Sequence, residues 1–330
     1  MPDIESDINA FRAAFGHLRA EVGTVIVGHA EVVDAVLFTL FAGGNCLLEG
    51  VPGLGKTMLV RTLAQALDLR FSRLQFTPDL MPADIVGTRL IQEDEHGRRT
   101  LVFQPGPVFA QIILADEINR ATPKTQSALL EARQEHSITV AGETRAMEEP
   151  FFVLATQNPL EMEGTYPLPE AQLDRFLMKV LVKTGSREEL AEVLRRTTEQ
   201  ARPAPRRVAD AAQIRTWQQL IRNAVVPPEV LDYAVRLTLA THPDTPFSTD
   251  SVKRFVRYGS SPRGAQALIM AGKVRALSDG RYHVAFEDIS ALALPCLRHR
   301  TLVNFEAEAE GMTGDRLVAD ILEKTPTIAS

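Results

Sequence analysis

The chain has 330 residues, of which 45% are hydrophobic and 24% are charged, so it can bury a sizeable core and is not a disordered protein. Its formal net charge of -6 provides no overall basic field for nucleic acid. At about 150 residues per domain, this length predicts about two domains.

Two cysteines, Cys46 and Cys296, stand far apart in the chain without a C-x-x-C pattern. We therefore expect two reduced core residues rather than a disulfide or a zinc site. The amino terminus is acidic and lacks the apolar segment of a secretory signal, and the longest apolar stretches are too short for a membrane span. These features predict a cytoplasmic protein.

The first expected helix covers residues 4–22, where apolar side chains recur at spacings of three or four. A short apolar turn over residues 25–28 follows. A second helix is expected from His29 to the stop signal at Gly43 and Gly44. An apolar run over residues 46–49 is then typical of a buried strand.

The stretch from Gly50 to Thr57, GVPGLGKT, matches the phosphate-binding motif G-x-x-x-x-G-K-[ST], and a helix-like run over residues 58–67 follows it. Glycines let successive backbone N–H groups and the helix amino terminus point at one anion. Lys56 adds a positive charge, and the Thr57 hydroxyl can ligate Mg²⁺. We therefore predict a site for ATP and Mg²⁺. The expected contacts are Gly50, Pro52, Gly53, Leu54, Gly55, Lys56, Thr57 and Met58.

Val27 and Gly28, in the turn ahead of this motif, are candidate base contacts, because such turns often lie over the adenine in nucleotide-binding ATPases. The turn could equally belong to the core. Beyond the motif, residues 70–76 are a strand candidate. A loop-rich region follows, with an expected hairpin between residues 88–91 and residues 99–103.

Residues 110–117, AQIILADE, form an apolar run that ends in adjacent carboxylates. This pattern is typical of a buried parallel strand whose carboxyl end delivers acids to a site. With an intact phosphate loop in the same chain, we expect Asp116 to hold the Mg²⁺ through its waters. Glu117 is expected to orient or deprotonate the attacking water.

A helix over residues 121–134 and a second hairpin over residues 137–147 come next, followed by a buried strand over residues 151–156. Asn158 stands at the end of that strand. Its amide could hydrogen-bond the γ-phosphate or the attacking water, or it could simply form an Asn-Pro turn.

Arg175, near the end of the stretch from 167 to 176, could be a solvated surface charge or an arginine finger. Several motifs together resemble the MoxR family of AAA+ ATPases, from about Val25 to the carboxyl terminus. They are Gly50–Thr57, Gln75–Leu80, Asp116–Ala121, Arg133–His136, Thr156–Pro159, Leu173–Phe176 and Ser261–Arg263.

The resemblance implies that Arg175 reaches into the nucleotide site of a neighbouring subunit, so that the chain forms a homo-oligomeric ring, usually a hexamer. Asn158 resembles the residue called sensor 1, and Arg263 resembles sensor 2, acting either within its own subunit or on the neighbour. The two hairpins resemble the helix-2 insert and the pre-sensor-1 insert of related machines. The expected catalytic residues are Glu117, Asn158, Arg175 and Arg263.

The composition shifts after Val182. Ser186 and Glu189 form a capping box at the start of an amphipathic helix over residues 186–200, and a Pro/Arg connector follows. Further helices, with no strand, are expected over residues 210–223, 227–241, 261–278, 285–297 and 313–323. The predicted fold is an α/β P-loop AAA+ core with a parallel sheet and β-hairpin inserts over residues 1–183, and an all-helical lid domain over residues 184–330.

The predicted function is ATP hydrolysis. The resemblance implies a chaperone-like role that remodels a client protein or assists metal-cofactor insertion, with a partner that carries a von Willebrand factor A (VWA) domain. A DNA-directed AAA+ motor is the alternative, but the net charge of -6 and the single Trp argue against it. A nucleotide-dependent scaffold is a third possibility, which the intact Asp116, Glu117 and Arg175 weaken.

Overall fold

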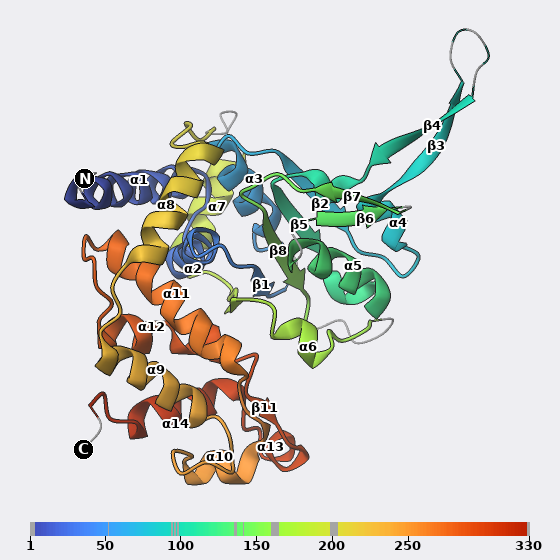
Figure 1. The fold of residues 1–330 in the computed structure, drawn as a ribbon. Helices are drawn as coiled ribbons and strands as arrows, with labels where there is room; N and C mark the ends of the chain where they lie inside the picture. The colour runs from blue at the N-terminus through green and yellow to red at the C-terminus, as the bar shows by residue number, and fades with distance from the viewer. Residues whose placement is uncertain are drawn as a thin grey trace.

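The computed structural model describes residues 4–51, 53–93, 95, 97, 99–134, 137–140, 142–159, 165–198 and 204–328. A five-stranded sheet with the order β2-β5-β8-β1-β9 forms the centre of the amino-terminal part (Figure 1), and every neighbouring pair is parallel. Its strands are β1 (Cys46–Glu49), β2 (Phe71–Gln75), β5 (Ile112–Asp116), β8 (Phe152–Gln157) and β9 (Met178–Leu181).

Both faces of this sheet are covered, which explains the nearly continuous apolar sequences of its central strands. Alternate side chains of β5 enter two different cores: Ile112 and Leu114 pack in one, and Ile113 and Ala115 pack in the other. The first core also contains residues of α1 (Ile4–Val25), α2 (Ala30–Phe41), α3 (Lys56–Ala66) and the carboxyl-terminal helices. The second contains residues of α4 (Pro82–Val86) and α5 (Pro123–Gln134).

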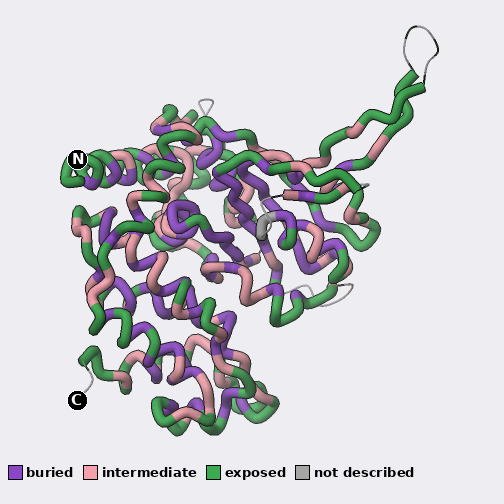
Figure 2. Tube along the Cα trace, in the orientation of Figure 1, coloured by how far each residue is buried: buried purple, intermediate pink, exposed green. Residues whose placement is uncertain are grey.

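Two antiparallel hairpins extend from the core, as the sequence predicts. β3 (Gly87–Glu93) and β4 (Arg99–Pro105) form the long hairpin that projects at the upper right of Figure 1, and most of its residues are exposed (Figure 2). β6 (Ser137–Val140) and β7 (Glu143–Ala146) form the short one. The hairpins contact each other, because Arg89 pairs with Glu143 and the Arg145 guanidinium lies 4.0 Å from the centre of the Phe103 ring.

The carboxyl-terminal part is mainly helical (Figure 1). Its helices are α7 (Arg187–Thr198), α8 (Ala211–Asn223), α9 (Pro228–Leu239), α10 (Asp250–Phe255), α11 (Pro262–Ser278), α12 (Phe286–Leu297), α13 (Phe305–Ala309) and α14 (Gly314–Lys324). The expectation of an all-helical lid needs one correction, since β10 (Val256–Tyr258) pairs with β11 (Leu302–Val303). The expected capping box is present: Glu189 accepts from the Ser186 amide, and the Ser186 hydroxyl accepts from the Glu189 amide.

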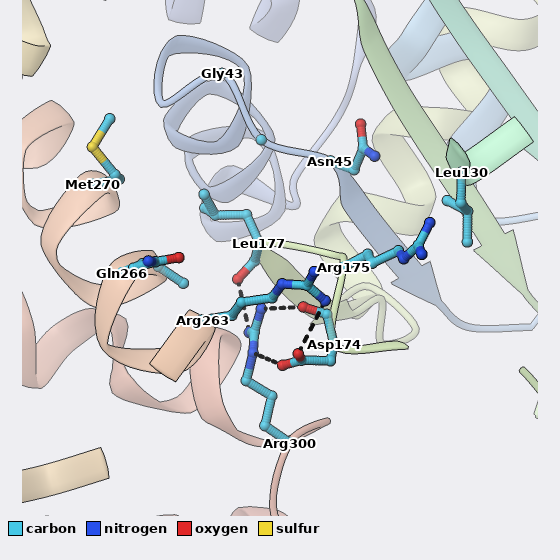
Figure 3. Close-up of a pocket in the computed structure, with 12 residues that line it drawn as sticks. Gly43, Asn45, Leu130, Asp174, Arg175, Leu177, Arg263, Gln266, Met270 and Arg300 are labelled. Atoms are coloured by element: carbon cyan, nitrogen blue, oxygen red, sulfur yellow. Dashed lines mark hydrogen bonds and ion pairs between the residues drawn. The ribbon is translucent and has the colours of Figure 1, made fainter. Parts of the chain in front are cut away.

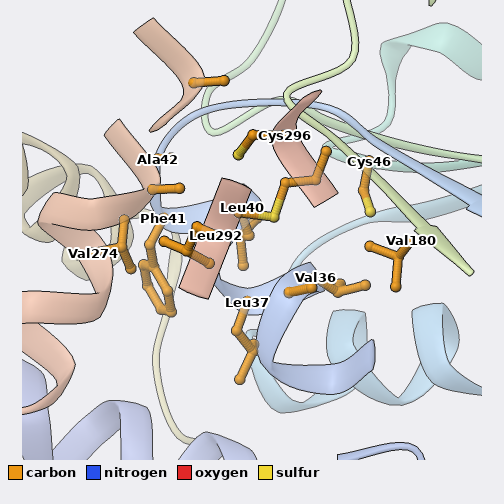
Figure 4. Packing of buried hydrophobic residues seen from close by; sticks show 14 of the residues in the cluster. Val36, Leu37, Leu40, Phe41, Ala42, Cys46, Val180, Val274, Leu292 and Cys296 are labelled. Atoms are coloured by element: carbon orange, nitrogen blue, oxygen red, sulfur yellow. The ribbon is translucent and has the colours of Figure 1, made fainter. Parts of the chain in front are cut away.

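The two cysteines lie in one apolar cluster between β1 and α12 (Figure 4). Both are free and buried, as the sequence predicts, and burial raises the pKa of each thiol to about 12. None of the described helices has the length and apolar character needed to cross a bilayer. The expected domain boundary at residues 183 and 184 stays a prediction.

Candidate active site

The phosphate loop connects the end of β1 to the start of α3. Gly53 and Gly55 have φ angles of 86° and 74°, in the left-handed region that glycine adopts without strain. Gly50 is also required, because a Cβ there would lie 2.6 Å from the Val182 carbonyl oxygen. The sequence-predicted contact Pro52 lies outside the described residues.

A cavity of about 490 Å³ opens at this loop, a size suited to a small-molecule ligand. Lys56 lies at its wall, with the Nζ donating to the Gly50 carbonyl oxygen. Burial lowers the pKa of Lys56, while the nearby Asp116 and Glu117 carboxylates act in the opposite sense. The residues lining the cavity are Gly53, Gly55, Lys56, Thr57, Met58, Arg61, Arg73, Gln75, Asp116, Glu117, Thr156 and Asn158.

Asp116 stands at the carboxyl end of β5, facing this cavity. Its Oδ1 accepts a hydrogen bond from the Thr156 hydroxyl at 2.6 Å, and its Oδ2 accepts from the Arg73 Nη2 at 2.6 Å. Hydroxyl and carboxylate oxygens are ligands that suit Mg²⁺, and the Thr57 hydroxyl lines the same cavity. The donor set therefore fits a magnesium ion, which would compete with Arg73 for the Asp116 carboxylate.

Glu117 is the next residue after Asp116, and its backbone is in the left-handed conformation with a φ angle of 55°. Its amide donates to the Thr156 hydroxyl at 2.9 Å, which fixes the turn. The carboxylate Oε2 accepts from the Gln75 Nε2 at 2.8 Å and pairs with the Arg120 Nε at 3.1 Å. Asn158, at the end of the neighbouring strand β8, is buried and lines the same cavity. The structure thus brings Glu117 and Asn158 to one place, as predicted from sequence.

Sequence reasoning missed three polar residues whose side chains donate hydrogen bonds to the carboxylates of Asp116 and Glu117. They are Arg73, Gln75 and Thr156. A usable signal existed. All three belong to strands β2 and β8, which flank β5, and the carboxyl ends of parallel strands meet at one edge of a sheet.

The turn before α2 lies beside the phosphate loop. Ile26, His29 and Leu54 line a narrow crevice there, together with residues of β1 and α3. The predicted base contacts Val27 and Gly28 sit between Ile26 and His29 without lining the crevice themselves. A Cβ on Gly28 would meet the Glu189 carboxylate at 2.3 Å, so α7 packs closely on this turn.

Arg175 and Arg263 lie far from the phosphate loop. They share a second cavity, of about 330 Å³, with Gly44 and Asn45, which precede β1. The phosphate loop instead follows β1, and the four residues of that strand span about 13 Å. The two arginines therefore lie at the amino-terminal ends of the strands, whereas Lys56 lies at the carboxyl-terminal ends. The structure does not bring them to their own subunit's phosphate loop.

Within this second cavity the two arginines differ in their contacts. The Arg263 Nη1 donates to the Asp174 Oδ2 at 3.3 Å. Figure 3 shows Arg175 extending away from Asp174, toward Asn45 and Leu130. Among the residues that the structure describes, its guanidinium has no hydrogen-bond or ion-pair partner, so its five donors are available to another molecule.

A phosphate loop after the parallel strand β1, acids at the end of β5 with β8 between these two strands, and a mainly helical lid define a P-loop ATPase of the AAA+ class. Residues 45–178 match the family described as ATPase family associated with various cellular activities (AAA). Residues 250–321 match the AAA lid domain.

Within that class, the chain belongs to the MoxR family of AAA+ ATPases. It is 41% identical over 303 residues to the chaperone MoxR1 of Mycobacterium tuberculosis, covering 92% of this chain and 79% of that protein. It is 29% identical to the protein MoxR of Methylorubrum extorquens, covering 96% of each. The crystal structure of a candidate ATPase from Cytophaga hutchinsonii superposes with a TM-score of 0.91 at 38% identity, covering 99% of this chain and 98% of that one.

Proposed function

We propose that this chain hydrolyses ATP at sites that neighbouring copies complete in a ring. We expect the ring to be a hexamer, as is usual for such machines. The observation that carries this proposal is the separation of Arg175 from the phosphate loop by the length of strand β1. A guanidinium without a partner in the described chain, at an edge remote from Lys56, is suited to act on the nucleotide of another copy.

In the proposed site, Lys56 and the backbone of the phosphate loop bind the ATP phosphates. Mg²⁺ held by Thr57 and Asp116 would neutralise charge on the β- and γ-phosphates. Glu117 orients or deprotonates the attacking water, and Asn158 donates to that water or to the γ-phosphate. Since Glu117 is also paired with Gln75 and Arg120, binding of substrate must loosen these contacts before the carboxylate can act.

We propose further that Arg263 acts on the neighbouring subunit beside Arg175. The shared cavity supports this choice over action within its own subunit, because Arg263 of α11 lines the same cavity as Arg175, away from Lys56. The Asp174 carboxylate holds the Arg263 guanidinium next to the turn that carries Arg175. Two positive charges would then approach one triphosphate together.

We propose that this hydrolysis drives the chaperone-like remodelling of a client protein. The relationship to a protein named as a chaperone supports this, as does the long exposed hairpin of β3 and β4 as a surface for contacting a client. Assistance of metal-cofactor insertion, and a partner with a VWA domain, rest on the family resemblance alone.

The test of the shared site is ATP turnover per subunit, measured with Mg²⁺ over a range of protein concentrations alongside the molar mass. We expect turnover to rise steeply over the concentrations at which the mass rises from monomer to ring. The reason is that a monomer lacks the Arg175 of a neighbour.

The matched control is the Lys56→Ala protein, which should assemble yet show no turnover at any concentration. Turnover that stays constant while the mass is that of a monomer would exclude a site shared between subunits. Absence of turnover from an assembled wild-type ring would contradict hydrolysis by the chain alone.

Replacement of Arg73 by glutamine should tighten Mg²⁺ binding. Arg73 occupies the Asp116 carboxylate in the structure, and its side chain is 49% exposed, so the pair is partly screened by water. An ion pair of this kind contributes up to about 1 kcal/mol, which corresponds to at most about a five-fold change. We expect the Mg²⁺ concentration for half-maximal binding of a fluorescent ATP analogue to fall two- to five-fold, while Arg61→Gln, another cavity arginine, should leave it unchanged.

A further inference from the structure

Arg300, three residues after the end of α12, is among the most deeply buried charged residues described, with 2% of its side chain exposed. A buried guanidinium is tolerated only when its donors are matched by acceptors. Here the Nε donates to the Asp174 Oδ1 at 3.0 Å. The Nη2 donates to the carbonyl oxygens of Asp174 and Phe176, at 2.9 and 2.6 Å.

The Arg300 Nη1 also donates to backbone carbonyl oxygens. It donates to the Leu177 carbonyl oxygen at 3.2 Å and to the carbonyl oxygen of Cys296 in α12. The adjacent His299 places its Nε2 3.0 Å from the Phe176 carbonyl oxygen. Burial lowers the pKa of His299 well below its usual value, so this ring is neutral near pH 7. One lid arginine therefore binds three backbone carbonyls of the four-residue segment from Asp174 to Leu177 and holds that segment onto the end of α12.

That held segment contains Arg175. It joins α6 (Glu170–Leu173) to β9, outside any helix or strand, so hydrogen bonds with the lid fix it where regular structure does not. Figure 3 shows the result: the Arg300 and Arg263 guanidinium groups point at Asp174 while the Arg175 side chain extends the other way. A group that acts on a transition state must be placed accurately, since an error of about 1 Å lowers the rate by about 100-fold.

We propose that Arg300 is a positioning residue for Arg175, fixing the turn from Asp174 to Leu177 to the lid so that the lid sets where Arg175 enters the neighbouring subunit's site. This inference rests on the proposed function. Arg300 does not touch the nucleotide; it acts through the backbone on either side of Arg175. A movement of α12 would carry the turn with it, and the state of one subunit's lid would reach the active site of the next.

The first experiment compares Arg300→Met and Arg300→Lys with the wild-type ring. Lysine keeps the charge but cannot match the five donors of the guanidinium. We expect kcat for ATP to fall 10- to 100-fold in Arg300→Met and less in Arg300→Lys. The KM and the dissociation constant of a fluorescent ATP analogue should stay within two-fold, because the phosphate loop is untouched.

Arg236 provides the matched control. Over the whole residue, Arg236 and Arg300 are each 5% exposed. The Arg236 guanidinium also donates to backbone carbonyl oxygens, those of Pro326 and Thr327. These contacts lie within the carboxyl-terminal part, away from Arg175. Arg236→Met should lower the unfolding midpoint as Arg300→Met does, but with kcat unchanged. Equal losses of kcat in both variants would reduce Arg300 to a general stabilising role.

Mixed rings separate positioning in the neighbour's site from damage to a subunit's own site. Lys56→Ala subunits have no turnover but carry an intact Arg175, whereas Arg300→Met subunits have an intact phosphate loop. Mixing the two should restore turnover above the sum of the separate proteins, because the first kind completes the sites of the second. No recovery in this pair would overturn the proposal.

A reference pair, Lys56→Ala with Arg175→Ala, tests the shared site independently. If the reference pair does not recover turnover, the proposed function itself fails; if only the Arg300→Met pair fails, the positioning role fails. Should Arg300→Met not assemble, Arg300→Lys takes its place in the same mixture, because it leaves the pair of Arg263 with Asp174 in place. The same recovery is expected.

Discussion

Replacement of Arg175 by alanine is expected to leave ATP binding largely intact and to lower turnover by about 10³–10⁵-fold. A reduction of this size corresponds to roughly 4–7 kcal/mol of activation free energy. In its proposed role, the guanidinium meets negative charge that develops only as the γ-phosphate is transferred, in the site of the neighbouring subunit. Truncation therefore removes stabilisation of the transition state and little stabilisation of bound ATP.

Single-turnover hydrolysis and equilibrium binding of a fluorescent ATP analogue measure the two quantities separately. Arg215→Ala, which removes an exposed arginine of α8, is the matched control and should retain wild-type turnover. Loss of binding with unchanged turnover per bound ATP would contradict the assignment of Arg175. Molar mass must be recorded with each variant, because failure to assemble would also abolish a shared site.

Replacement of Glu117 by glutamine is expected to produce a ring that binds ATP and stalls. The amide cannot accept the proton of the attacking water, and loss of such a group lowers the rate by about 10²–10⁴-fold. The shape of the side chain is kept, so its contacts with the turn after β5 should survive in part. Hydrolysis in a single turnover, followed by quenching with acid, measures the expected loss.

The Glu117→Gln protein should also retain ATP through gel filtration, whereas the wild-type protein should retain ADP. Glu131→Gln, at an exposed position of α5, removes a carboxylate of the same length elsewhere and should behave as wild type. Wild-type turnover in Glu117→Gln would mean that another group activates the water. Asp116 would then be the next carboxylate to replace.

The strands and helices with strong periodicity could be predicted from sequence, and their observed bounds differ by a few residues at most. Several short elements could not. β9 is four residues long and includes Lys179, whose ammonium pairs with Glu49 of β1 at 2.7 Å. Such a strand is stabilised by its neighbour in the sheet, and its own pattern carries little signal. α10 and α13, of six and five residues, are too short to show a helical period.

The candidate site divides in the same way. Asp116, Glu117 and Asn158 were predictable because each ends a buried parallel strand, and the ends of such strands meet. The role of Arg300 could not be predicted, because it is 126 residues from Asp174 in the chain and no local sequence pattern indicates the contact. The position of Arg175 opposite the phosphate loop follows from strand direction, but only once β9 is known to be a strand.

The contact between the two hairpins links the nucleotide end of the sheet to the outermost part of the molecule. β7 leads through residues 147–151 into β8, and β8 ends beside Asn158. β7 is also joined to the long hairpin, through Arg145 on Phe103 and through the pair of Glu143 with Arg89. A two-stranded ribbon alone is marginally stable, so these contacts contribute to its order. A displacement at the nucleotide end of β8 would therefore reach the long hairpin through β7 and these two contacts.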